Sequence, residues 1–272
     1  MRRTVLCCML CLVFTFARSQ SFLSPVSNSY TRTNTYSSVN KDAFSFTANQ
    51  ASLALNKNFS AGFYGERRYM LAELSCYQLA LAVPTSSGNF GLQANYSGNA
   101  GFNETGAGLA YARSLGQVDF GVQFNYYQVK IAGYGNASAV NFEAGGILHI
   151  NEQFQTGVHV YNPTGAHVGK ANEEQLPFVY SFGLGYDASE KFFIGAEIQK
   201  EEDQPVNANI GLQYAFEKKL FTRVGISSAT ASFYLGTGFL WNGFRIDVTA
   251  SIHPTLGVTP GMLLVYNATA KN

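Results

Sequence analysis

The sequence predicts an all-β protein, a transmembrane antiparallel β-barrel of about fourteen strands with an N-terminal hatch-like segment. Three observations support this: apolar and polar residues alternate along most of the chain, every second turn is short, and charge is scarce. Charged residues make up 13% of the 272 residues, whereas aromatic residues reach 14% and glycines number 27. A soluble domain usually carries about twice that share of charge. The composition therefore favours a barrel in lipid.

Residues 244–252 (FRIDVTASI) show the alternation without an exception. Phe244, Ile246 and Val248 alternate with Arg245 and Asp247, which is the period of a strand with one apolar and one polar face. A soluble sandwich gives the same period, but its outer face usually carries Lys and Glu. Here the polar positions of several strands hold mostly Asn, Gln, Gly and Ser. We therefore expect the apolar set to face lipid and Arg245 and Asp247 to face the lumen.

The connecting segments are an independent test, because a bacterial barrel has short turns at its periplasmic end and longer loops outside. The predicted strands are 59–66, 74–83, 89–97, 104–114, 117–131, 138–150, 153–161, 178–187, 191–200, 205–217, 220–227, 231–240, 243–252 and 258–267. Turns after even-numbered strands are tight, as in NE at 151–152 and WNG at 241–243. Those after odd-numbered strands are mostly longer, as in 162–177, with 227–230 as the exception. This sorting by parity is not expected of a soluble sandwich.

The N-terminus predicts export. Arg2 and Arg3 precede an apolar run from Val5 to Phe16, and Ala17-Arg18-Ser19 fits a cleavage site. We therefore divide the chain into a signal peptide (1–19), a hatch or plug segment (20–58), the barrel (59–267) and a C-terminal tail (268–272). The expected location is the bacterial outer membrane.

The charged residues, cysteines and histidines of the sequence argue against several classes of function. The formal net charge of +1 provides no argument for nucleic-acid binding. After signal cleavage Cys76 is the single cysteine, which predicts a small packing residue and no internal disulfide. The four histidines form no HExxH or HxxxH pattern, so we expect no metal site and no cofactor. GxSxG is absent, and no catalytic residues are assigned.

Seven polar residues are predicted to face the lumen. They are Glu143, Glu197, Arg223, Arg245, Asp247, His149 and His159. Buried charges persist only when they are paired or solvated. Two interpretations of the charged set are open: an interior network that holds the hatch, or a polar constriction that selects what passes. The two histidines lie on neighbouring strands at inward positions, so they could approach each other as a ligand-binding or catalytic pair, or be ordinary lumenal polar residues.

One connecting segment mixes charge with large apolar residues. It contains Arg67, Arg68, Tyr69, Met70 and Leu71. One interpretation is an extracellular hairpin that folds over the barrel mouth. The other is a hydrophobic capture or docking patch.

The stretch DAFSFTANQASLA (42–54) resembles the segment at the start of FadL-type barrels, the long-chain fatty-acid transporters. Asn49, Ala51, Leu53 and Ala54 match that motif, and Gln50 stands where the family usually has proline. The closing SIHPTLGVTPGMLLVYN (251–267) looks like the last hairpin of Bacteroidota relatives, which include PorV/PorQ-type proteins of type IX secretion. The resemblance implies a fourteen-stranded barrel with an N-terminal hatch. It also implies either passage of hydrophobic molecules or a secretion role.

The leading hypothesis is thus a non-enzymatic outer-membrane barrel, either a channel for hydrophobic small molecules or an accessory barrel of type IX secretion. Its expected partners are outer-membrane lipid, a hydrophobic ligand in the lumen, and secretion-machinery or surface-complex proteins. An alternative is a structural barrel without a pore that anchors a surface or periplasmic complex. A barrel lipid hydrolase would need a Ser or His pair at the lipid-facing rim, and the sequence indicates none.

Overall fold

The computed structural model describes residues 29–169, 174–202, 204–216 and 219–268. The predicted signal peptide and most of the predicted tail lie outside these ranges. The strands are β1(Ser60–Arg67), β2(Ser75–Thr85), β3(Gly88–Gly98), β4(Phe102–Ser114), β5(Val118–Ile131), β6(Gly135–His149), β7(Phe154–Tyr161), β8(His167–Val168), β9(Glu174–Gln175), β10(Val179–Ser189), β11(Phe192–Glu201), β12(Asn207–Ala215), β13(Leu220–Ser227), β14(Ser232–Trp241), β15(Phe244–His253) and β16(Gly257–Asn267).

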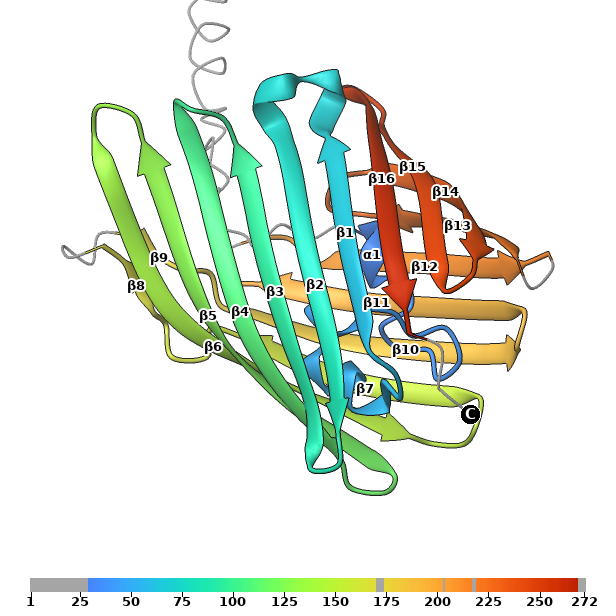
Figure 1. The fold of residues 1–272 in the computed structure, drawn as a ribbon. Helices are drawn as coiled ribbons and strands as arrows, with labels where there is room; N and C mark the ends of the chain where they lie inside the picture. The colour runs from blue at the N-terminus through green and yellow to red at the C-terminus, as the bar shows by residue number, and fades with distance from the viewer. Residues whose placement is uncertain (1–28, 170–173, 203, 217–218, 269–272) are drawn as a thin grey trace, which may run out of the picture.

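Fourteen of these strands form one closed antiparallel barrel (Figure 1). Each strand pairs with its neighbour in the chain, β7 pairs with β10, and β1 closes onto β16 with Ser60 opposite Asn267. The predicted fold class and strand number are confirmed. Closure leaves no free strand edge in the barrel, so the wall satisfies its own backbone hydrogen bonds.

The structure differs from the sequence prediction mainly in its loops. Several strands extend further into these connections than expected, namely β3, β4, β6, β15 and β16, so the connections 99–101, 132–134 and 254–256 are short. The difference in loop length between the two ends of the barrel therefore comes mainly from the connections 68–74 and 162–178. The second of these contains β8 and β9, a two-stranded sheet outside the barrel wall. Each has two residues, too few to show a period in the sequence.

The tight turns follow from local residue chemistry. Asn242 and Gly243, between β14 and β15, have φ values of 49° and 84°. Two successive residues with positive φ form the type of hairpin turn for which Asn-Gly is favoured. This turn sets the register in which Trp241 pairs with Phe244, and so it orients the inward residues of β15.

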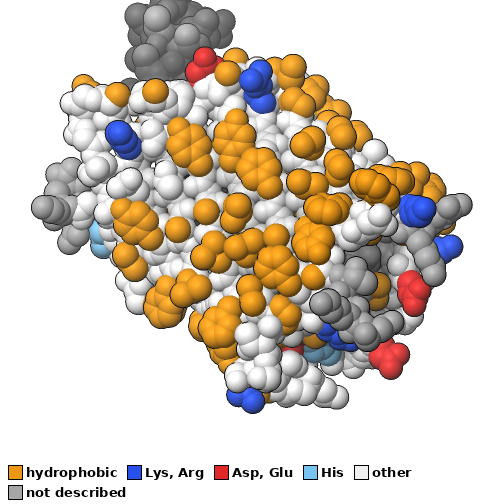
Figure 2. Space-filling model, viewed as in Figure 1, with side chains coloured by type: hydrophobic (Ala, Val, Ile, Leu, Met, Phe, Trp, Pro, Cys, Tyr) orange, Lys and Arg blue, Asp and Glu red, His pale blue; other side chains and the backbone are white. Residues whose placement is uncertain are grey.

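The barrel carries apolar side chains outside and polar side chains inside. On β15, Phe244, Ile246 and Val248 are 44%, 48% and 64% exposed, whereas Arg245 and Asp247 are 6% and 0% exposed. Figure 2 shows apolar side chains spread over the wall. Along the described barrel strands, the charged residues at outward positions are Arg67, Arg113, Lys130 and Lys200, each within one residue of a strand end. The predicted orientation of 244–252 is confirmed.

The hydrophobic core lies between the barrel wall and the N-terminal segment, residues 29–58. This segment contains α1(Ser29–Arg32) and two 3-10 helices, η1(Ser45–Thr47) and η2(Gln50–Leu55), and it lies inside the barrel (Figure 1). Phe44, Phe46 and Leu53 are almost fully buried in a cluster with small and aliphatic wall residues. None of the described helices has the length and apolar character needed to cross a bilayer.

Candidate functional site

A cluster of buried charges joins the N-terminal segment to β13 and β15. Asp42 accepts contacts from Arg245 at 2.8 Å and Arg223 at 3.4 Å. Arg245 also contacts Asp247 at 3.1 Å. The Tyr30 hydroxyl donates to Asp247 at 3.0 Å, which adds a second link from the segment. We call Asp42, Arg223, Arg245 and Asp247 the charge latch.

The charge latch holds Asp42 in its ionised form. Burial by itself would raise the pKa of the Asp42 carboxyl, but the guanidinium groups of Arg245 and Arg223 hold that pKa below its ordinary range. Both arginines and Asp42 are almost fully buried. Removing one partner from such a group leaves an uncompensated buried charge, so the members depend on one another.

Two further anchors lie on β11 and β10, which follow β13 and β12 around the barrel. Arg32 in α1 contacts Glu197 of β11 at 2.5 Å, and the Tyr36 hydroxyl donates to the same carboxylate at 3.3 Å. Asp187 near the end of β10 accepts a hydrogen bond from the Ser37 hydroxyl at 2.7 Å and from the Ser38 backbone N–H at 2.7 Å. The segment is thus bound to several sides of the wall.

The motif that resembles the FadL-type start surrounds η2. Asn49 caps this helix by accepting from the Ala51 N–H at 3.1 Å, and its amide donates to the Val158 carbonyl of β7 at 3.0 Å. Ala51 and Leu53 are fully buried, and Ala54 packs at the edge of the core. Asn49 therefore both starts the helix and attaches it to the wall.

Glycines in the wall allow this close approach. A Cβ at Gly121 of β5 would clash with the backbone carbonyl carbon of Gln50, and one at Gly145 of β6 would clash with the Asn49 side chain. Gly121 and Gly145 are opposite each other in the β5–β6 register. Any side chain at this pair would push η2 away from the wall.

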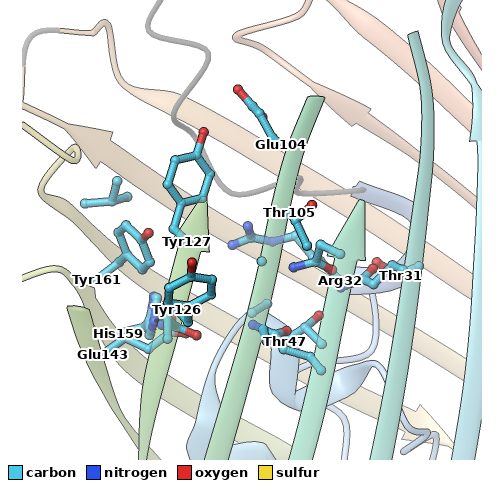
Figure 3. A pocket seen from close by; sticks show the side chains of 18 of the residues that line it. Thr31, Arg32, Thr47, Glu104, Thr105, Tyr126, Tyr127, Glu143, His159 and Tyr161 are labelled. Atoms are coloured by element: carbon cyan, nitrogen blue, oxygen red, sulfur yellow. Dashed lines mark hydrogen bonds and ion pairs between the residues drawn. The ribbon is translucent and has the colours of Figure 1, made fainter. Parts of the chain in front are cut away.

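A pocket of about 100 Å³ lies in the lumen beside the N-terminal segment (Figure 3). Thr31, Arg32, Thr47 and Ala48 of the segment form part of its lining, and strands β2 to β7, β10 and β11 supply the rest. Its wall residues include Gln78, Gln93, Asn95, Glu104, Gly106, Asn125, Tyr127, Glu143, His159, Tyr161, Val179 and Gln199. The pocket is therefore rich in amide groups and also carries aromatic surface.

Most of the residues predicted to face the lumen lie either among the contacts that hold the N-terminal segment or at the pocket. Arg223, Arg245 and Asp247 belong to the charge latch, and Glu197 anchors the segment. Glu143 instead lines the pocket, where it contacts His159 at 2.8 Å. His149 contacts Asp119 at 2.7 Å. The two histidines are therefore not brought together, because each is bound to its own carboxylate at a different height in the wall. In the described ranges no three His, Cys, Asp or Glu residues could hold a metal ion.

The segment 67–71 lies at the end of the barrel that carries the longer connections. Arg67 ends β1, and Arg68 contacts Glu66 at 2.9 Å. The Tyr69 N–H donates to the Thr259 hydroxyl at 3.0 Å, and its ring lies edge-on to His253. Met70 and Leu71 are 63% and 50% exposed. The first part of the segment is thus tied to its neighbours, and the apolar tip is not.

Several residues that make these contacts were missed by the sequence prediction. Asp187 and Asp119 occupy inward positions of predicted strands, so the parity rule used for Glu143 would have found them. Asp42 and Arg32 lie in a segment without strand periodicity, where no such rule applies. The sequence did contain one signal for Asp42 and Arg32. Residues 20–58 contain few charged residues, and a charged side chain that is buried needs a partner of opposite charge.

Comparisons with solved structures agree with the fold. The Pseudomonas putida toluene transporter TodX matches with a TM-score of 0.63 and 10% identity, over 86% of this chain and 96% of that chain. The CymD monoaromatic hydrocarbon channel matches with 0.60 and 10%, over 86% and 94%. A Pseudomonas aeruginosa FadL homologue matches with 0.57 and 11%, over 85% and 94%. At these identities the likeness concerns the fold. No protein-family model matches the sequence, and no curated protein matches it.

Proposed function

We propose that this protein is an outer-membrane channel for small hydrophobic molecules, closed by a hatch formed by its N-terminal segment. The observation that carries the proposal is the combination of a lumenal pocket with a buried segment that lies in the lumen beside it. The TodX, CymD and FadL-homologue structures, two of which are described as monoaromatic hydrocarbon channels or transporters, support it by fold.

The membrane location is supported by the distribution of side chains. The outward faces of the strands are apolar, and their charged residues are confined to strand ends. A soluble barrel would have the opposite arrangement, because exposed apolar surface of this extent is unfavourable in water. Lipid contact explains both the apolar exterior and the satisfied, closed backbone.

The hatch role is supported by the type of contacts that the segment makes. The charge latch, Arg32–Glu197 and the Asp187 hydrogen bonds are polar links between the segment and the barrel wall. Polar links can exchange with water when the segment moves, and the apolar contacts of Phe44, Phe46 and Leu53 with the wall would have to separate in the same motion. Passage through the lumen would require this segment to shift.

An uptake experiment tests the proposal. The wild-type protein is expressed in a bacterial host whose own hydrophobic-solute channel is deleted, and entry of labelled toluene is measured. Insertion is verified in parallel by a heat-modifiability gel shift of the membrane fraction. We expect uptake above the empty-vector rate. A correctly inserted barrel that leaves the rate unchanged would contradict the proposal.

A second candidate is the non-conducting structural barrel. It is favoured by the density of contacts between the segment and the wall, with Asp42, Ala51 and Leu53 each almost fully buried. Single-channel recording in planar bilayers separates the two candidates, since a structural barrel should show no opening events.

The type IX secretion role and a capture role for residues 67–71 stay predictions. The first is tested by co-purification with secretion components, and the second by uptake after Met70→Ser and Leu71→Ser.

A further inference from the structure

The inward face of the barrel wall carries more acidic than basic side chains. Along the described barrel strands, seven carboxylates and two guanidinium groups are buried at inward positions. The carboxylates are Glu66, Glu104, Asp119, Glu143, Asp187, Glu197 and Asp247, and the guanidinium groups are Arg223 and Arg245. The outward charged residues of these strands, Arg67, Arg113, Lys130 and Lys200, are all basic. The excess of acidic groups therefore belongs to the lumen side of the wall.

The N-terminal segment has the complementary charge. Residues 20–58 contain three basic residues, Arg32, Lys41 and Lys57, and one acidic residue, Asp42. Arg32 contacts the Glu197 carboxylate of β11 at 2.5 Å. The segment thus brings positive charge to an acidic wall.

Lys41 is a second cation of the segment that faces acidic wall groups. Its ammonium donates to the Thr35 carbonyl at 3.0 Å, which is a contact within the segment. Burial lowers the pKa of Lys41 to about 8, and the negative charges of Asp119, Asp187 and Asp42 oppose that shift. Asp119 and Asp187 belong to β5 and β10, so the charge of Lys41 is balanced in part by the wall.

Displacement of the segment would leave acidic wall groups without these cations. Glu197 would lose its contact with Arg32, and Asp187 would lose the nearby charge of Lys41. On the inward face of the described strands, Arg223 and Arg245 are the buried guanidinium groups that remain. An open lumen would therefore carry an excess of negative charge.

A narrow passage lined by one sign of charge concentrates ions of the opposite sign and excludes ions of the same sign. The barrel wall lies in lipid of low dielectric constant, so its field is focused into the lumen. Such focusing raises the local concentration of counter-ions roughly 10- to 1,000-fold. Rings of Asp and Glu select cations in pores for the same reason. A permeating carboxylate would be repelled by the wall, whereas a neutral solute would not.

We infer that the open lumen rejects carboxylates and other anions and admits neutral or amine-bearing small molecules. This inference rests on the proposed function, because it names the class of solute that the same channel admits. Asp119, Asp187 and Glu197 are the specificity-determining residues, since they are the wall carboxylates from which the cations of the segment move away.

Reversal potentials in planar bilayers test the inference on the full chain. A KCl gradient is applied across bilayers containing the wild type or Gly121→Ala, whose new Cβ would meet the Gln50 backbone and displace η2. The pH is about 8, where histidine side chains are ordinarily neutral. At about 0.1 M salt we expect K⁺ to permeate at least about fivefold better than Cl⁻, and we expect this preference to decrease at about 1 M, where charges are screened within about 3 Å. A ratio near one, or a preference for Cl⁻, would overturn the inference.

Neutralised variants connect the preference to named wall residues. Asp187→Asn combined with Glu197→Gln keeps the side-chain sizes and removes two lumenal charges, and we expect the ratio of K⁺ to Cl⁻ permeability to fall at least about twofold. Glu152→Gln combined with Glu190→Gln is the matched control, because it changes the net charge equally at exposed residues of the turns. We expect the control to keep the wild-type ratio. An equal fall in both pairs, or no fall in the first, would overturn the assignment to the lumen wall.

Organic ions extend the test to the class of solute. Benzoate and benzyltrimethylammonium each have one ring and one charge, of opposite sign. Their entry into proteoliposomes is measured, with protein-free liposomes as the control. We expect benzyltrimethylammonium to enter at least about fivefold faster than benzoate. Equal entry, or faster entry of benzoate, would contradict the inference.

The outcome is separable from that of the uptake experiment. Toluene uptake without a preference for cations would leave the channel function standing and refute the inference. Cation-selective openings without toluene uptake would support the inference and refute a channel for hydrophobic solutes. The absence of openings in both the wild type and Gly121→Ala would refute both.

Discussion

At the residue scale, Asp42 holds the N-terminal segment to the barrel wall. It lies between Arg223 and Arg245, and in the described contacts it is the carboxylate through which the segment binds these two arginines. The three side chains are almost fully buried, so the charge of each compensates that of the others. Asp42 and Arg223 are 181 positions apart in the sequence. A single substitution at this residue should therefore act on the segment as a whole.

Asp42→Asn is expected to loosen the segment. It leaves Arg245 with Asp247 and removes the one carboxylate that Arg223 contacts among the described ion pairs, and breaking a buried pair in this way costs about 3–5 kcal/mol. Limited proteolysis in detergent should cleave within residues 29–56 at least about a hundredfold faster than in the wild type. Asp119→Asn is the matched control, because Asp119 is equally buried but bonds to His149 in the wall. Equal cleavage of both variants would refute the latch.

The pH dependence of the same contact follows from the lowered pKa of Asp42. A carboxyl with a depressed folded pKa contributes stability that is complete above its unfolded pKa, about 4, and is lost as pH falls through the folded value. We therefore expect the difference in cleavage rate between wild type and Asp42→Asn to be constant from about pH 5 to 8. The difference should shrink only below about pH 4. A loss of the difference near neutral pH would contradict this assignment.

At the scale of elements, η2 is positioned by two wall glycines rather than by its own helix propensity. Gly121→Ala should displace it, because the new Cβ would meet backbone atoms of Gln50 that cannot rotate away. Planar-bilayer recordings should then show opening events more often than in the wild type. Gly146→Ala is the control, since Gly146 faces outward on the adjacent strand and its nearest neighbour would be 3.9 Å away. A silent Gly121→Ala channel would argue against docking of η2 as the closing element.

The outward positions of the strands are predicted to contact lipid. Val248 lies midway along β15 at an outward position, and Val258 lies near the start of β16. A lipid-facing arginine costs about 2–4 kcal/mol at the bilayer midplane and about 0–1 kcal/mol near its surface. Val248→Arg should therefore reduce the heat-modifiable, folded fraction after refolding into liposomes, whereas Val258→Arg should not. Similar yields for both variants would mean that this face does not contact lipid.

At the scale of the whole molecule, barrel closure depends only on the strands. Ser60 of β1 pairs with Asn267 of β16, and no part of the N-terminal segment belongs to the sheet. The segment adds apolar contacts and the charge latch to a wall that is already complete. The barrel and its hatch are therefore separable in principle.

Deletion of residues 29–56 is expected to leave a folded barrel with an open lumen. The residual wall still closes its hydrogen bonds, and water can solvate Arg223, Arg245 and Asp247 once the segment is gone. The deletion variant should retain a heat-modifiability shift and show a steady conductance larger than that of the wild type. Loss of the shift would show instead that the segment is required for folding.

The strands and their faces could be predicted because they depend on neighbouring residues. Period-two alternation identified Phe244 and Val248 as outward and Arg245 as inward, and Asn242-Gly243 marked a hairpin without reference to the rest of the chain. The sequence likewise assigned Glu143, Glu197 and Arg223 to the lumen. It could not assign their partners. The alternation along a strand shows which face a residue lies on, but it shows neither the height of that residue in the lumen nor the strand that lies across from it.

The sequence by itself determined a barrel of this strand number, with an apolar outside and a polar inside, since both are properties of local periodicity. Only the tertiary structure decided which inward charges meet. It placed Asp42 between Arg223 and Arg245, it separated His149 from His159, and it brought residues of eight strands into the lining of one pocket. These contacts join residues far apart in the chain, and they exist only once register and closure bring distant strands and the N-terminal segment to the same height in the lumen.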